Sequence, residues 1–80
     1  MSEPWECSAW NDTEATLKQL ENDSSETARL RRINIWNAQA DFLYGLSDVL
    51  KQEGRHEDAD QTHSRANERW GMVVAAVSTQ

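Results

Sequence analysis

Two histidines and two acidic residues in the second half of the chain form its best metal-binding pattern. His56, Asp60 and His63 fall at positions i, i+4 and i+7, on one face of a helix, with Glu57 beside them. Histidine and carboxylate groups are ligands of zinc and other divalent metals. The spacing lacks the HExxH order with a third ligand behind it, and His63 also falls on the expected packing row of its helix. We therefore expect a hydrogen-bonded or half-buried histidine here and no metal site.

Cys7 is the only cysteine, and its chemistry is equally limited. Its neighbour Glu6 is negative, whereas a nucleophilic cysteine needs a positive neighbour to stabilise the thiolate. A single cysteine also excludes an internal disulfide framework and favours a reducing compartment. The sequence contains no Ser/His/Asp order, no glycine-rich phosphate loop and no separated carboxylate pair. We predict that the protein is not an enzyme and uses no cofactor.

The elements that carry these residues are predicted to be helices of one domain. The chain has 80 residues, only 3 glycines and 1 proline, and no run in which apolar and polar residues alternate. We predict an all-α fold, either a small helical hairpin or a three-helix bundle with an irregular N-terminal arm. The expected elements are an arm over residues 1–11, a short helix over 12–22 capped by Asn11 or Asp12, a long helix over 24–53 and a C-terminal helix over 56–78. The polar segment 21–26 favours a break, and one continuous helix from about Asp12 is the alternative.

Charged residues are distributed unevenly along the chain. Residues 1–27 hold seven acidic residues and one lysine, which account for the whole net charge of −6. Residues 28–80 hold seven acidic and seven basic residues. Proteins that bind nucleic acid directly need a basic face to neutralise phosphates, so we predict no direct nucleic-acid binding. The acidic third instead supports an alternative function, a mimic that blocks the nucleic-acid-binding surface of a partner protein.

Apolar residues are too many for one narrow seam between two helices. Two adjacent rows run along the long helix: Ile33, Trp36, Ala40, Leu43 and Leu50 form the first, and Ile35, Phe42, Leu46 and Val49 form the second. The expected inward row of the last helix is Ala59, His63, Ala66, Trp70, Val73 and Val77. The tryptophans of the arm are expected to fold back onto the helices, pack across an interface or dock on a partner. The predicted partner-binding residues are Trp5, Trp10, Trp36, Phe42, Trp70, Met72, Val73, Val74 and Val77.

The segment from residue 40 to residue 71 has the spacing of a known helical repeat. Its matching positions are Leu46, Leu50, Gly54, His56, Ala59 and Ala66, with the glycine at the turn. In this register the segment resembles one tetratricopeptide repeat. The departures are Leu43, Ser47 and Gly71, where the family often has tryptophan, a small glycine or alanine, and proline. The resemblance implies a helical hairpin that binds a protein or peptide and performs no catalysis.

Taken together, these patterns predict a small, non-catalytic protein–protein interaction module of the adaptor, chaperone or inhibitor type. Small bacterial secretion-system chaperones and phage-encoded inhibitors have this general build. The expected partner is either another protein or a second copy of the chain in a homodimer. The first residues lack the basic start and long apolar core of a signal peptide, and the longest apolar run is too short to span a bilayer. We therefore expect a cytoplasmic protein without a membrane span.

Overall fold

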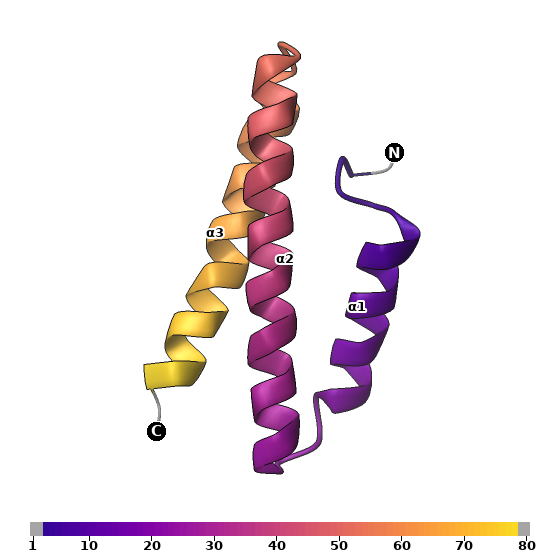
Figure 1. The fold of residues 1–80 in the computed structure, drawn as a ribbon, viewed down its shortest axis with the longest axis vertical. Coiled ribbons are helices and arrows are strands. Elements are labelled where there is room, and N and C mark those ends of the chain that lie inside the picture. The colour runs from indigo at the N-terminus through magenta and orange to yellow at the C-terminus, as the bar shows by residue number, and fades with distance from the viewer. Residues whose placement is uncertain (1–2, 79–80) are drawn as a thin grey trace.

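Three helices make up the fold in the computed structural model, which describes residues 3–78 (Figure 1). They are α1 (Ser8–Leu20), α2 (Glu26–Gln52) and α3 (His56–Ser78). Successive helices run in opposite directions, and α1 and α3 lie on opposite sides of α2 in the view of Figure 1. No strand occurs between residues 3 and 78, so the predicted all-α fold is confirmed. Over the same residues, no helix has a stretch long and apolar enough to cross a bilayer.

Helix α1 begins earlier than the sequence predicts, at Ser8 and not at residue 12. Its N-cap is Cys7, in an extended conformation, and the Cys7 carbonyl accepts a hydrogen bond from the Asn11 N–H at 2.9 Å. Neither Asn11 nor Asp12 is the N-cap, and the predicted arm over 1–11 is shorter, with its first two residues outside the described range. The extra turn carries Trp10, and burial of that side chain outweighs the weak helical pattern of the segment.

A tight polar turn separates α1 from α2. The hydroxyl of Ser25 accepts a hydrogen bond from the Ala28 N–H at 3.2 Å and caps α2. The Ser25 N–H itself donates to the Asp23 carboxylate at 2.9 Å. These bonds satisfy backbone groups that the ends of a helix leave without partners. The chain therefore forms two helices here and not one, and α2 begins at Glu26 and not at residue 24.

Gly54 ends α2 and turns the chain into α3. Its φ of 80° lies in the left-handed region, which glycine adopts without a steric cost. The Arg55 N–H donates to the Leu50 carbonyl at 2.9 Å, and the Gly54 N–H donates to the Lys51 carbonyl at 3.1 Å. This pair of bonds is a Schellman motif, which satisfies the last free carbonyls of α2. The turn brings α3 back antiparallel to α2.

Small side chains let α2 and α3 pack closely along their length. Leu43, Thr62 and Ala66 have no exposed surface. Alanines along both helices allow the backbones to approach. The Thr62 hydroxyl donates to the Asp58 carbonyl at 2.7 Å, so its burial leaves no hydrogen bond unmade.

The inward row of α3 contains Ala59, Ala66 and Val73 as predicted, but not His63, Trp70 or Val77. Its buried members are Ala59, Thr62, Ala66 and Val73. Thr62 is buried where His63 was expected, and the nearly buried Arg69 takes the place expected for Trp70. Trp70 and Val77 are about half exposed. Arg69 turns inward in place of Trp70 because Glu14 and Trp10 of α1 lie on its edge of α3.

Candidate functional site

The histidine pattern of α3 does not gather into a metal site. His63 is exposed, and its ring meets the ring of Tyr44 edge to face, with the centroids 5.3 Å apart. The Tyr44 hydroxyl donates to the side-chain oxygen of Asn67 at 2.6 Å. Within residues 3–78, no group of three or more histidine, cysteine, aspartate or glutamate side chains is arranged to hold a metal ion. These contacts instead join α2 to α3 along one edge of the hairpin.

Trp5 and Trp10 pack on the opposite edge of the hairpin. Both side chains are buried, and they form a cluster with Leu43 and Ala66 at the centre of the hairpin. Their rings lie 6.4 Å apart, and the Trp10 ring lies 6.2 Å from that of Phe42. Two of the predicted partner-binding residues therefore fill the protein's own core and offer no free surface in this conformation.

Two arginines of α3 cover the tryptophans. The guanidinium of Arg65 lies 5.4 Å from the centre of the Trp5 ring, and that of Arg69 lies 5.6 Å from the centre of the Trp10 ring. Cations at this distance are attracted to the negative face of an indole. The arginines are spaced i, i+4, so one edge of α3 receives both aromatic groups. This role of the arginines is not predicted from the sequence, where they count only toward the charge balance of residues 28–80.

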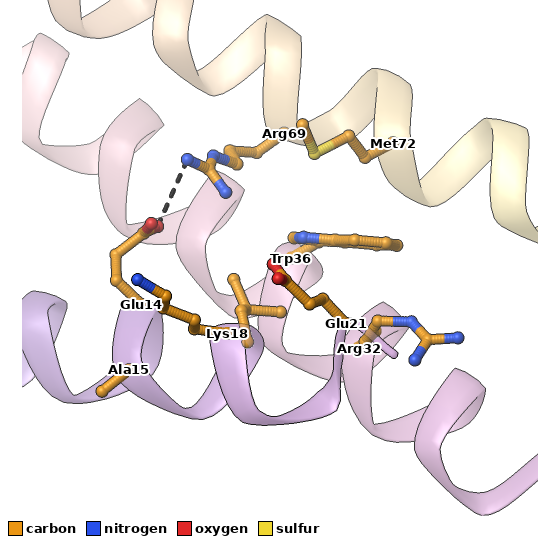
Figure 2. A pocket seen from close by; sticks show the side chains of 9 residues that line it. Glu14, Ala15, Lys18, Glu21, Arg32, Trp36, Arg69 and Met72 are labelled. Carbon is orange, nitrogen blue, oxygen red and sulfur yellow. Dashed lines mark ion pairs between the residues drawn. The ribbon is translucent and has the colours of Figure 1, made fainter. Parts of the chain in front are cut away.

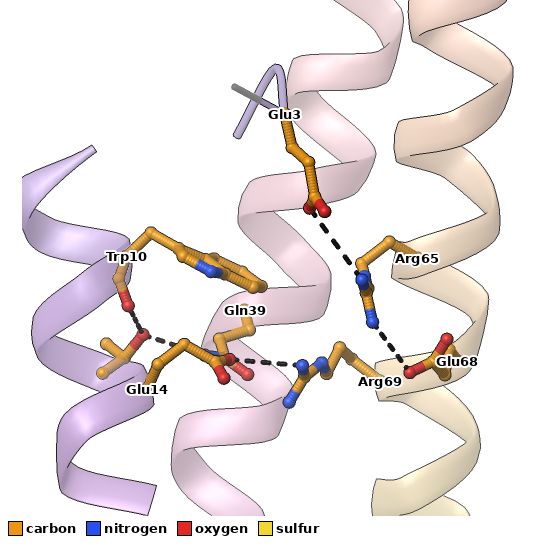
Figure 3. A network of polar contacts seen from close by, with 8 residues as sticks. Glu3, Trp10, Glu14, Gln39, Arg65, Glu68 and Arg69 are labelled. Atoms are coloured by element: carbon orange, nitrogen blue, oxygen red, sulfur yellow. Dashed lines mark hydrogen bonds and ion pairs between the residues drawn. The ribbon is translucent and has the colours of Figure 1, made fainter. Parts of the chain in front are cut away.

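A network of polar side chains reinforces the same edge (Figure 3). Glu14 of α1 forms an ion pair with Arg69 at 3.2 Å and accepts a hydrogen bond from the Gln39 amide nitrogen at 3.0 Å. The same nitrogen donates to the Thr13 hydroxyl at 2.8 Å. The Arg69 side chain is 11% exposed and the Glu14 side chain 39%, so the arginine lies largely out of water while its carboxylate partner is partly solvated. Residues from all three helices are therefore joined through one carboxylate.

A groove of about 480 Å³ opens beside this network, between α1, α2 and α3 (Figure 2). Its apolar lining includes Leu17 of α1, Trp36 of α2 and Met72 of α3. Its charged lining consists of Glu14, Lys18, Glu21, Arg32 and Arg69. The groove thus combines an aromatic surface with an excess of positive groups, in a chain whose net charge is negative.

Four large apolar side chains are exposed on the other edge of the hairpin. We call Leu30, Trp70, Val74 and Val77 the apolar face; each is between 47% and 50% exposed. Trp70 and Val77 follow His63 at seven and fourteen residues, and Val74 follows Asn67 at seven, so they continue the edge marked by Tyr44. The Arg29 guanidinium donates to the Ala76 carbonyl at 3.1 Å, which sets Leu30 at the same end of the hairpin as Val77.

The remaining predicted partner-binding residues divide between core and groove. Val73 is buried between the helices, while Trp36 and Met72 are half-buried in the groove. Phe42 is 44% exposed but lies against Trp10, at the edge of a small apolar notch of about 190 Å³. The predicted set is therefore not one surface: only Trp70, Val74 and Val77 stay together, and Leu30 joins them.

The acidic third of the chain is partly neutralised by arginines. The pairs are Glu3 with Arg65, Glu14 with Arg69 and Glu26 with Arg29, at distances of 3.9, 3.2 and 2.7 Å. Hydrogen bonds from the Arg29 guanidinium lower the pKa of the Glu26 carboxyl below its ordinary value. Among residues 3–78, Glu6, Asp12, Glu21 and Asp23 have no such ion pair. The charge that the fold presents outward is thus smaller than the sequence count suggests.

Comparison with known proteins adds no relative to this description. The chain matches no protein-family model, no curated protein and no solved structure.

Proposed function

We propose that the protein is a non-catalytic protein–protein interaction module that binds through its apolar face. The observation that carries the proposal is the helical spacing of Trp70, Val74 and Val77 on one edge of α3, each about half exposed, with the equally exposed Leu30 at the same end of the hairpin. Scattered single apolar residues are normal on a protein surface, whereas a group of large ones marks a binding surface. Tryptophan is also the residue type most enriched among those that dominate binding energy.

The partner that the charges favour is a second copy of the chain. No charged residue occurs from Trp70 to Ser78, so a charged partner surface would find nothing to pair with there. Glu14 of α1 and Glu3 of the preceding arm lie on the other edge of the hairpin, paired with Arg69 and Arg65. Two copies that meet through their apolar faces therefore keep their acidic segments apart, and repulsion between two chains of charge −6 is reduced.

Two further features support an interaction module. The resemblance of residues 40–71 to a tetratricopeptide repeat points to the same kind of function, because such hairpins bury one another's faces or bind peptides. Cys7 is a free, exposed thiol, which supports a reducing compartment such as the cytoplasm. Both features are compatible with a protein that binds a partner and catalyses no reaction.

Sedimentation velocity over a series of protein concentrations tests the proposal. The wild type should pass from monomer to dimer as the concentration rises, and Trp70→Ala with Val74→Ala should weaken the dimer by at least about tenfold. Val49→Ala is the matched control, because Val49 is exposed as much as Val74 but lies outside the apolar face. Circular dichroism should show equal helix content in all variants. A wild type that remains monomeric throughout, or equal weakening by the control, would contradict the proposal.

The acidic mimic is the second candidate, and the acids without ion pairs in α1 and at its two ends support it. Glu6, Asp12 and Glu21 are exposed, and none has an ion pair within the described residues. Glu3, Glu14 and Glu26 instead form ion pairs with arginines of the same chain, so little negative charge remains for a basic partner surface. Binding of this kind should fall steeply with salt and should survive Trp70→Ala. Binding that is independent of salt excludes it.

A further inference from the structure

The groove between the three helices has the size and lining of a small-molecule site. Its volume of about 480 Å³ lies within the range of ligand pockets, and its lining is contributed by all three helices. Leu17, Trp36 and Met72 supply the apolar part. Figure 2 shows the Trp36 ring between the chains of α1 and α3, with charged groups on both sides of it. An apolar body of moderate size can therefore lie against the indole.

Two of the three positive groups of the groove have no ion pair with its carboxylates. Within residues 3–78, the Lys18 ammonium group takes part in no ion pair. The Arg32 guanidinium donates to the carbonyl oxygens of Leu20 and Asp23, at 2.6 and 3.0 Å, and its charge also interacts with the Asp23 carboxylate, which is not part of the lining. Arg69, by contrast, is paired with Glu14.

The negative groups of the groove are fewer. Glu14 is occupied, since it pairs with Arg69 and accepts a hydrogen bond from Gln39. Glu21 is the one carboxylate of the lining that has no such partner among the described residues. Within the lining, Lys18 and Arg32 thus have no carboxylate of the groove as a partner, against Glu21 alone, and of the two Lys18 is the one without any nearby carboxylate partner outside it. That balance suits a ligand with a single negative charge and disfavours a doubly charged phosphate, which Glu21 would repel.

We propose that this groove binds an amphipathic carboxylate, a molecule with a flat aromatic or short aliphatic body and one carboxylate group. The body lies against Trp36, Leu17 and Met72, where it removes apolar surface from water. The carboxylate lies beside Lys18, whose flexible chain can follow it. Glu21 limits the affinity, because its charge has the same sign as that of the ligand.

Three probes with the same aromatic body and different charges test the proposal: indole-3-acetate, neutral indole and the cation tryptamine. Binding is followed in the intact protein by NMR through the indole N–H signal of Trp36, which Trp36→Phe identifies among the four tryptophans. Indole-3-acetate should bind more tightly than indole, and tryptamine least. Equal binding of the three probes, or a preference for tryptamine, would overturn the proposal.

Charge variants of the groove make the test specific. Lys18→Ala should weaken indole-3-acetate about two- to fivefold and leave indole unchanged, as expected for a solvent-exposed ion pair. Lys51→Ala is the matched control: Lys51 is the only other lysine, it is exposed, and it does not line the groove. Glu21→Gln should strengthen binding of indole-3-acetate. Equal effects of the two lysine variants, or weaker binding with Glu21→Gln, would show that no built anion site exists here.

Discussion

Replacement of Trp10 by alanine should detach α1 from a hairpin that stays folded. Trp10 is 7% exposed and touches the rings of Trp5 and Phe42 and the guanidinium of Arg69. The only other buried residue of α1 is Leu20, at its far end. Leu43 packs with Trp10, but α2 and α3 also bury Leu50, Ala59 and Thr62 and are joined at the Gly54 turn, and these contacts do not involve α1. Trp10 is thus the main apolar anchor of α1, beside the polar contacts of Glu14 and Thr13.

The size of the effect follows from the buried area. A tryptophan side chain that buries about 200 Å² contributes about 5 kcal/mol at about 25 cal/mol/Å². Partial collapse of the neighbours leaves a loss of about 4 kcal/mol, in line with other buried tryptophan truncations. Hydrogen exchange at pH 7 measures this loss of stability at each backbone amide. The protection factors of the α1 amides should fall by about a thousandfold. If docking of α1 contributes less free energy than the predicted loss, the α1 amides should exchange as fast as those of an unfolded chain.

The prediction is tested by whether Trp10→Ala lowers amide protection in α1 more than in α2. The amides around Leu43 in α2 should keep measurable protection in Trp10→Ala, because the hairpin retains its own core and turn. Trp70→Ala is the matched control: Trp70 is half exposed on the other edge, so the loss is about half as large and falls on α3 without a selective effect on α1. Equal loss of protection in α1 and in the centre of α2 would refute the view that Trp10 fastens α1 to a self-sufficient hairpin.

Three further changes test other parts of the fold. Gly54→Ala should cost about 1 kcal/mol in urea unfolding, since its φ of 80° strains any side chain, whereas Gly45→Ala, in helical backbone with open space around it, should stabilise by about 0.5 kcal/mol. The backbone N–H of Ser25 lowers the pKa of Asp23 below its ordinary 3.8, so Asp23→Asn should lower the melting temperature at neutral pH. This difference should shrink as the pH falls through the lowered pKa, where the wild type also becomes protonated. Glu14→Gln should destabilise by about 1 kcal/mol in urea, because the nearly buried Arg69 loses its carboxylate; a change equal to that of an exposed acid would argue against the buried pair.

The features that the sequence predicted correctly depend on neighbours along the chain. The break before α2 follows from polar side chains that bond to the nearby backbone, as Asp23 and Ser25 do. The turn at Gly54 follows from the lack of a Cβ in a left-handed position. The all-α class follows from helical spacing of apolar residues without alternation. Each of these signals extends over only a few residues.

The features that it missed depend on residues far apart in the sequence. Arg65 and Arg69 lie over Trp5 and Trp10, about sixty positions earlier, and no local pattern indicates such a contact. The start of α1 at Ser8 depends on the same contacts, because burial of Trp10 stabilises a turn of low helical tendency. The exposure of Trp70 likewise depends on distant residues, because Glu14 and Trp10 lie beside its neighbour Arg69, which turns inward in its place. Adjacent residues of a helix point about 100° apart, so Trp70 then lies at the surface.

Helix α3 serves three surfaces with adjacent residues, and this explains the unusual apolar run at its end. Arg69 and Met72 face the groove, Val73 enters the core, and Trp70 and Val74 form the apolar face. A helix with one buried stripe needs apolar residues at only three or four positions in every two turns. A helix that also supplies a groove and an exposed face needs them on most of its circumference. The two proposed sites share this helix but no residue, so a carboxylate in the groove should leave self-association unchanged unless α3 itself moves.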